Sequence, residues 1–398
     1  MNPTRRGTPD FLLLFLTLAL VAFGLIMVFS ASSMTAAYKW EKPFYFTETQ
    51  AIAVSIGLIA MFLVMNIHIR KLHRWVKPGF MLTLILLILV QLIGSVGEYG
   101  GRSWIPLGPF NLQPSEFAKI AIILYLAALI SKKGERSESF SKGLLPALIV
   151  TAMPMLLIVF TDLGSALILM FSAITIIAIG GANLKHIFAI VGGLMALAAI
   201  AISLLFLVKP DSYQLKRLTT YLDPWQDPLG DGFQIINSLY ALGNGGFSGT
   251  GLGQSIQKLH FLTQAHNDFI FAIIGEELGF VGSSVFLLIY VFFIWRGIIV
   301  SLRCPDRFAQ LLGVGIMSLV AIQALVNLGG VTNTIPLTGV TLPLISYGGS
   351  SIIATLIAMG IVLSISREQQ DIKPTQKREC KPSDGLHSLF LRPRAVTN

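Results

Sequence analysis

Long runs of apolar residues, separated by short polar segments, extend over almost the whole chain. Ten of these runs approach or exceed the roughly 20 residues that a helix needs to cross a bilayer. Lipid offers the backbone no hydrogen-bond partners, so such runs form helices, and the two-residue alternation of a membrane barrel is missing. The pattern predicts an all-α, polytopic membrane protein with spans at 11–31, 50–67, 79–96, 114–131, 143–160, 164–182, 186–208, 268–299, 307–329 and 340–365.

Lysine and arginine are concentrated in every second connection between these spans. Membrane proteins keep such residues on the cytoplasmic side, so both termini are expected in the cytoplasm. A single membrane domain then covers residues 11–366, between a short N-terminal segment, 1–10, and a flexible basic tail, 367–398. The basic residues that set this orientation include Arg70, Lys71, Arg74, Lys77, Lys132, Lys133, Arg136 and Lys142.

The longest connection, residues 209–267, falls between the seventh and eighth spans and is expected to be extracellular. It is rich in Gly, Pro and Asp, and a loop of that length is usually functional or disordered. Its aromatic residues argue against simple disorder: Trp225, Phe233, Tyr240 and Phe247.

Composition excludes a soluble globular protein and narrows the classes of partner. The chain is 54% hydrophobic and 12% charged, with a mean hydropathy of +0.73. The cytoplasmic bias of Lys and Arg accounts for the net charge of +9, so no nucleic-acid partner is implied. Cys304 and Cys380 both fall on the expected reducing side, so no disulfide is predicted.

Apart from Arg307 at the first position of the ninth span, Asp, Glu, Lys and Arg occur in only two of the predicted spans, the fourth and the eighth. The fourth carries Glu116 and Lys119 on one face, and the eighth carries Asp268, Glu276 and Glu277. Such groups are costly in lipid and normally face a protein interior or a water-filled cavity. The sequence therefore predicts one polar site between these two helices.

Further charged residues lie near the same expected outer face. Arginine presents a planar fork of donors that suits phosphate. The site could hold an anionic, phosphorylated lipid headgroup beside a carboxylate base. Its basic residues would be Arg102, Lys119 and Arg217, and its carboxylates Asp162 and Asp268.

Each of these residues also has a structural interpretation. Glu116 and Lys119 could form only an intrahelical ion pair, and Asp162 or Asp268 could cap a helix. Arg102 and Arg217 could be interfacial anchors. A metal site at His260 and His266 has little support, since no Cys or helical His pair accompanies them.

The eighth span is too long for a straight crossing. As one helix, residues 268–299 would extend about 48 Å, against a hydrocarbon core of about 30 Å. The helix could tilt, kink at Gly279 or Gly282, or project its first turns above the membrane, and projection is favoured because it places Asp268 at the water-filled mouth of the site. Glu276 and Glu277 then lie deeper and are expected to support the helix.

Five motifs in order resemble the FtsW/RodA/SpoVE family (shape, elongation, division and sporulation proteins, SEDS). They are "GGRSWIPLGPFNLQPSEFAK", "TDLGSAL", "YQLKRLTTYLDPWQDPLGDGFQ", "AHNDFIFAIIGEELGFVG" and "TLPLISYGGSS". The resemblance covers nearly the whole chain, and "GEELGFVG" with "GVTLPLISYGGSS" is closer to the division and sporulation branch. Ser350 and Ser351 in the last motif suit helix packing, with a binding role as the alternative.

The resemblance implies a ten-helix peptidoglycan glycosyltransferase of the bacterial cytoplasmic membrane that polymerises lipid II. It also implies a class B penicillin-binding protein as partner, with other divisome or elongasome proteins. The family's essential aspartate corresponds to Asp268, and its polar cavity to Arg102, Glu116, Lys119, Asp162 and Arg217.

The residues agree with this chemistry. Asp268 can take a proton from the attacking sugar hydroxyl, and basic side chains can neutralise the pyrophosphate leaving group. The sequence indicates no cofactor with certainty, and a divalent cation, Mg²⁺ or Mn²⁺, could share the second task. The alternatives are a lipid II flippase, which would need a polar path near the midplane, and a scaffold for envelope proteins.

Overall fold

The computed structural model of the protein describes residues 7–96, 102–107, 110–134, 139–159, 161–208, 213–230, 232–259 and 261–368. Eight helices in this part of the chain are long and apolar enough to cross a membrane. Two further apolar helices, α6 (Leu163–Ile179) and α7 (Leu184–Val208), correspond to the remaining predicted spans. The eight are α1 (Phe11–Trp40), α2 (Tyr45–Met65), α3 (Ile69–Ile93), α4 (Pro114–Lys133), α5 (Leu145–Val159) with the preceding π turn η2 (Phe140–Leu144), α10 (Ile270–Leu302), α11 (Arg307–Val331) and α12 (Gly349–Glu368).

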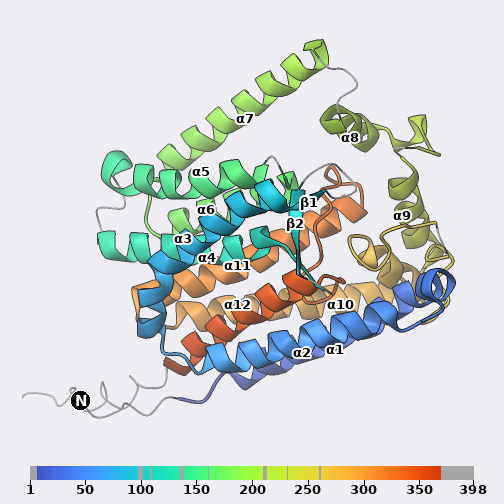
Figure 1. Ribbon diagram of the computed structural model, residues 1–398, viewed down its shortest axis with the longest axis horizontal. Coiled ribbons are helices and arrows are strands. Elements are labelled where there is room, and N and C mark those ends of the chain that lie inside the picture. The colour runs from blue at the N-terminus through green and yellow to red at the C-terminus, as the bar shows by residue number, and fades with distance from the viewer. Residues whose placement is uncertain are drawn as a thin grey trace, which may run out of the picture.

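The helices form a bundle with two distinct ends (Figure 1). The beginning of α1 and the end of α12 lie together, since Gly7 and Arg367 exchange hydrogen bonds: Gly7 N donates to Arg367 O at 3.2 Å, and Arg367 Nε to Gly7 O at 3.0 Å. We call this the terminal end. The opposite end, on the right in Figure 1, carries the short strands and the long loop, and we call it the loop end. The all-α, multi-pass membrane architecture expected from the sequence is confirmed.

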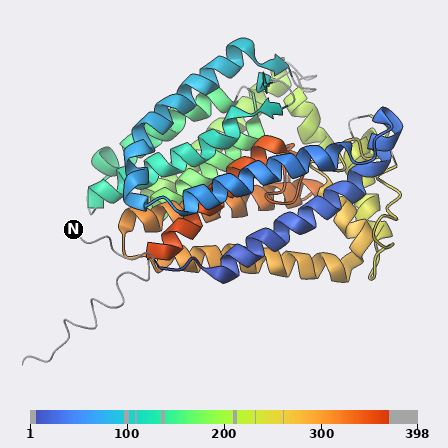
Figure 2. The ribbon, with the colours of Figure 1, turned by 60° about the horizontal axis from the view of Figure 1, so that its bottom comes forward.

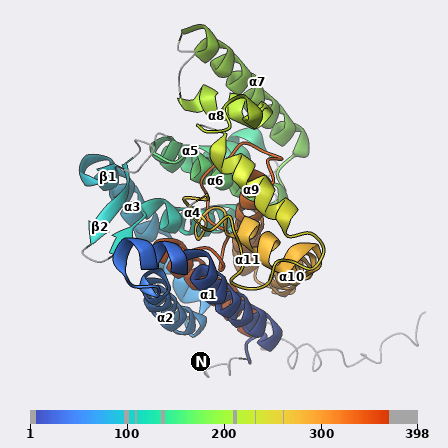
Figure 3. The same cartoon turned by 90° about the vertical axis from the view of Figure 1, so that its right-hand side faces the viewer.

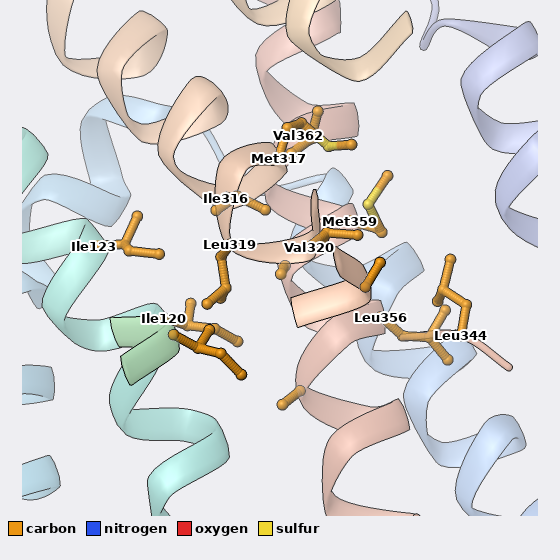
Figure 4. Packing of buried hydrophobic residues seen from close by; sticks show 14 of the residues in the cluster. Ile120, Ile123, Ile316, Met317, Leu319, Val320, Leu344, Leu356, Met359 and Val362 are labelled. Carbon is orange, nitrogen blue, oxygen red and sulfur yellow. The ribbon is translucent and has the colours of Figure 1, made fainter. Parts of the chain in front are cut away.

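The centre of the bundle consists of α4, α11 and α12 (Figure 4), where buried aliphatic side chains such as Ile120, Leu319 and Met359 interdigitate. α2 packs along α12. A Cβ atom at Gly360 would lie 2.7 Å from the Met61 carbonyl oxygen, so only glycine permits this approach. Small residues at helix contacts are the usual way to bring membrane helices together.

α7 stands away from the rest of the bundle in two views (Figures 1 and 3) and contacts mainly its neighbours α6 and α8 (Tyr213–Leu222). Its large apolar side chains are exposed, among them Phe188 and Met195. Exposed apolar side chains of this kind suit contact with lipid rather than with water.

The connections at the loop end are more ordered than the sequence indicated. A small antiparallel sheet of order β1-β2-β3 precedes α4, with β1 at Ser95–Val96, β2 at Arg102–Leu107 and β3 at Phe110–Leu112. The 209–267 connection contains α8, a 3₁₀ turn, η3 (Pro224–Gln226), and α9 (Phe233–Asn244). Ile235, Ile236 and Ala241 of α9 are buried, so the loop packs onto the bundle.

Several predicted spans differ from the structure: α1 continues past residue 31 to Trp40, and α3 begins at Ile69 and not at residue 79. The last helix begins at Gly349 and not at residue 340, because Pro343 lacks an N–H donor and Leu344 adopts a left-handed conformation, with φ 66°. Residues 332–348 are therefore non-helical. α10 is kinked at Gly279 (φ 66°, ψ −170°), whereas projection of its first turns was favoured from the sequence, with a kink at Gly279 or Gly282 as an alternative. The tail beyond residue 368, Cys380 and His260 lie outside the described residues, and Cys304 is buried with a free thiol.

Candidate functional site

Asp268 lies in the turn that leads into α10, at the loop end. The Nδ2 atom of Asn327 donates to the Asp268 carbonyl oxygen at 2.8 Å and to the Val340 carbonyl oxygen at 2.7 Å. The half-buried Asp268 carboxylate lies beside Gly339, where an added Cβ atom would be 3.5 Å from Oδ2. The N-cap position of α10 is Phe269, one residue after Asp268.

The same part of the 332–348 segment receives Arg217 from α8. Arg217 Nη1 donates to the Leu337 carbonyl oxygen at 3.1 Å, two residues before Gly339. The start of α6 also reaches this point, since a Cβ atom at Gly164 would lie 2.9 Å from the Thr338 carbonyl oxygen. Elements far apart in sequence thus meet at residues 337–340, and they bring Arg217 and Asp268 to one place.

Asp162 is the N-cap of α6. Its carboxylate accepts hydrogen bonds from the Ser165 backbone N–H at 2.9 Å and the Ser165 hydroxyl at 2.6 Å. The side chain of Gln113, just before α4, donates to the second oxygen at 3.3 Å. The capping role that the sequence left open is therefore present, and it orients the helix end that contacts Thr338.

Glu116 and Lys119 form a buried ion pair of 2.8 Å within α4. Lys119 is only 1% exposed, and its ammonium also donates to Gln323 Oε1 of α11 at 3.0 Å. Gln323 Nε2 in turn donates to the Thr341 carbonyl oxygen at 3.2 Å. The pair is thus intrahelical, yet it is connected through α11 to the 332–348 segment.

Arg102 lies in β2 and is exposed. Its Nη1 donates to the carbonyl oxygens of Gln91 at 3.2 Å and Leu92 at 3.4 Å, in the last turn of α3. A cation at a helix C-terminus interacts favourably with the helix dipole. These hydrogen bonds connect Arg102 to α3, and not to the place where Arg217 and Asp268 meet.

Glu276 and Glu277 are buried in the first half of α10, 0% and 1% exposed. Glu276 accepts hydrogen bonds from the hydroxyl of Ser255 and from the backbone N–H groups of Ile256 and Gln257 at 3.1 and 3.3 Å. Glu276 therefore holds a stretch of the long loop against α10.

Glu277 pairs with Lys258 of the long loop at 2.9 Å. It also accepts a hydrogen bond of 2.6 Å from the Ser30 hydroxyl of α1, which runs beside α10 (Figure 2). Lys258 is 4% exposed, so both charges are removed from solvent and each depends on the other.

Ser350 and Ser351, the other residues for which the sequence left a binding role open, make packing contacts. Ser350 Oγ donates to the Asn111 carbonyl oxygen at 2.8 Å and accepts from the Gln113 N–H at 3.0 Å, joining the start of α12 to β3 and α4. The hydroxyl oxygens of Ser351 and Thr341 are 3.0 Å apart.

His266 is surrounded by aromatic rings. Its ring centroid lies 4.2 Å from that of Phe46 and 5.3 Å from that of Tyr347. Burial, reinforced by the charge of Lys39, lowers the pKa of His266 to about 4. Among the described residues, no three side chains of His, Cys, Asp or Glu gather as metal ligands.

Several polar residues of the site were not predicted from the sequence. Gln323 and Asn327 stand four residues apart in an otherwise apolar span, a signal that a search for charged residues passes over. Lys258 lies in the long polar loop, where lysine is normally solvated, so its burial had no signature.

The sequence and the fold both have known relatives. The model of the FtsW/RodA/SpoVE family, described as a cell cycle protein, matches residues 11–371. The stage V sporulation protein E of Bacillus subtilis (strain 168) is 45% identical over 367 residues, which cover 92% of this chain and 98% of that protein. A probable peptidoglycan glycosyltransferase FtsW of Trichlorobacter lovleyi is 42% identical over 367 residues, with 92% and 95% covered.

Solved structures share the fold over most of its length. One of them is a chain of a peptidoglycan synthase complex whose structure concerns the coordination of polymerization and crosslinking. It superposes with a TM-score of 0.73 and 31% identity, covering 91% of this chain and 98% of that one. The rod shape determining protein RodA of Thermus thermophilus gives a TM-score of 0.65 and 29% identity, covering 91% and 97%. On these similarities, the chain belongs to the FtsW/RodA/SpoVE family.

Proposed function

We propose that this protein is a peptidoglycan glycosyltransferase that polymerises lipid II at the outer face of the bacterial cytoplasmic membrane. The observation that carries the proposal is the meeting of Asp268 and Arg217 at residues 337–340. A half-buried carboxylate and a guanidinium group at the end of a membrane bundle suit a substrate whose lipid tail remains in the bilayer. Relatives described as probable peptidoglycan glycosyltransferases support it.

In the proposed reaction, Asp268 is the general base. A sugar hydroxyl of one substrate attacks the anomeric carbon of the other and transfers its proton to the Asp268 carboxylate. The new glycosidic bond forms as the bond from the anomeric carbon to the pyrophosphate oxygen breaks. With one base and no second carboxylate as nucleophile, the expected outcome is inversion by single displacement.

Basic residues stabilise the leaving pyrophosphate in this proposal. Arg217 is half-buried and bound to Leu337, two residues before the Gly339 that Asp268 approaches, and a guanidinium group there is less screened than in water. Lys119, paired with Glu116, contributes positive charge from α4, and Arg102 contributes at the exposed rim. Asp162 orients the start of α6.

A class B penicillin-binding protein is the proposed partner, since one structural relative belongs to a complex that couples polymerization to crosslinking. The high identity to a sporulation protein and to division proteins supports a role in one of those processes. The expected orientation places the loop end outside the cell, on the side where crosslinking occurs.

The decisive test is the purified protein in liposomes containing lipid II, with and without the partner and with and without a chelator. Asp268→Asn should abolish glycan chain formation, while Asp223→Asn, which alters a half-buried carboxylate that caps η3, should not. Near-normal polymerisation by correctly inserted Asp268→Asn would refute the base assignment. Transfer of lipid II between leaflets without polymerisation would favour the flippase alternative.

A further inference from the structure

A glycine-rich strip of the long loop, residues 246–251, is joined to α10 at its kink by four backbone hydrogen bonds. Two run from the strip to the helix: Thr250 N donates to Glu276 O at 2.9 Å, and Gly251 N to Glu277 O at 3.0 Å. Two run from the helix to the strip: Phe280 N donates to Gly246 O at 2.8 Å, and Val281 N donates to Phe247 O at 3.1 Å.

These are the groups that the kink leaves without their helical partners. In a regular α-helix, Glu276 O would accept from Phe280 N, and Glu277 O from Val281 N. The conformation of Gly279 breaks both bonds, and the strip supplies a donor or an acceptor for all four groups. The strip is thus inserted into the backbone hydrogen-bond pattern of the helix and provides partners for these four groups.

The approach of the two backbones depends on glycine. A Cβ atom at Gly249, which has φ +81°, would lie 2.2 Å from Glu277 O. A Cβ atom at Gly279 would lie 2.2 Å from Gly249 N, and one at Gly245 would lie 2.0 Å from Gly275 O. Real Cβ atoms do not approach so closely, so a larger residue at any of these positions must separate the strip from the helix.

The side chains beside the kink reinforce the same connection. Glu276 binds residues 255–257, and Glu277 pairs with Lys258, so backbone and side-chain contacts both link the loop to the first half of α10. The second half, after the kink, meets the strip through the amides of Phe280 and Val281 and through an edge-to-face contact of the Phe247 and Phe280 rings, whose centroids are 6.0 Å apart.

We infer that residues 246–258 and the first half of α10, Ile270–Leu278, form one rigid unit that orients Asp268. Gly249, Gly279, Glu276, Glu277 and Lys258 are then positioning residues for the transfer reaction. The inference rests on the proposed function, since it takes Asp268 to be the base. A straight helix would satisfy these backbone groups without the loop. The inserted strip in addition fixes the direction of the helical segment Ile270–Leu278, and Asp268 lies two residues before this segment.

The matched variants are Gly249→Ala and Gly253→Ala. Both glycines have a left-handed conformation, φ +81° and +80°, so alanine strains both by a similar amount. Only at Gly249 would the new methyl group meet α10, because nothing lies within 4 Å of a Cβ atom at Gly253. The difference between the variants therefore isolates the insertion.

Gly249→Ala should lower kcat for lipid II polymerisation at least tenfold, with KM within about threefold, because misplacement of a base by about 1 Å can cost about a hundredfold in rate. In hydrogen exchange on the full chain, its amides from Ile270 to Val281 should exchange faster. Gly253→Ala should match the wild type in both measurements. Glu276→Gln, which keeps the shape of the side chain, provides a milder change and should shift both readouts in the same direction.

The outcomes separate the two proposals. Folded Gly249→Ala protein with wild-type exchange over Ile270–Leu278 would overturn the rigid unit. Faster exchange with unchanged kcat would overturn the positioning role. Wild-type protein that fails to polymerise lipid II even with its partner would overturn the proposed function, and with it the positioning role, while the exchange comparison would still decide the rigid unit.

Discussion

Asn327 holds the main chain of Asp268: its Nδ2 atom donates to the Asp268 carbonyl oxygen at 2.8 Å. The same nitrogen donates to the Val340 carbonyl oxygen at 2.7 Å, and the residue is 4% exposed. One amide of α11 therefore fixes the turn before α10 against the 332–348 segment. This relationship sets the distance between the proposed base and the segment that also binds Arg217.

Asn327→Asp should impair both stability and catalysis. The substitution keeps the shape but replaces the donor by an oxygen that repels two carbonyl oxygens, and it removes both hydrogen bonds, at a cost of about 1–3 kcal/mol each. We expect a lower midpoint of thermal unfolding in detergent and a kcat reduced at least tenfold. Asn237→Asp, the same change at a buried α9 residue bonded to its own helix, is the control. Equal activities of the two variants would contradict the prediction.

The membrane architecture could be predicted because its physical cause is local. Each span is a contiguous apolar run, and the start of α4 at Pro114 follows from a proline that suits the first helical turn. The non-helical segment 332–348 was predicted only in part. Residues 340–348 are apolar enough to continue a helix, so the sequence pattern did not reveal that Pro343 and the left-handed Leu344 delay the start of α12.

The candidate site was predictable as a set of residue types, but not as an arrangement. Charged residues in apolar runs drew attention to Lys119 and Asp268, because burial of charge is costly wherever it occurs. Lys258 and Asn327 remained unrecognised, because their importance comes from contacts with Glu277 and Asp268 that only the tertiary fold creates.

Lys258→Met should destabilise the protein strongly. It leaves the buried Glu277 carboxylate with Ser30 but without its counter-charge, and breaking such a pair costs about 3–5 kcal/mol. The double variant Lys258→Met/Glu277→Gln removes both charges and should recover most of the loss. Thermal unfolding of the purified variants measures both effects. A double variant no more stable than Lys258→Met would show that the ion pair is not the cause.

The Glu116–Lys119 pair can be tested for a role beyond helix packing. Lys119→Met should lower stability by a similar amount, since Glu116 is then buried unpaired. The double variant Glu116→Gln/Lys119→Met should regain stability but remain poorly active, because the positive charge for the leaving group is still missing. Thermal unfolding and lipid II polymerisation are measured together. Recovery of both would support the purely structural interpretation.

His266 should make the protein less stable in acid. Its pKa is lowered from 6.5 to about 4 in the folded protein, so between these values the unfolded chain binds a proton that the folded protein does not. The contribution of His266 to the free energy of unfolding is therefore fully present above pH 6.5. It is lost as the pH falls towards 4, by about 1.4 kcal/mol per pH unit. His266→Phe keeps a ring between Phe46 and Tyr347 but cannot titrate. The midpoint of thermal unfolding of the variant should decline less than that of the wild type between pH 6.5 and 4, and parallel declines would assign the acid sensitivity to other groups.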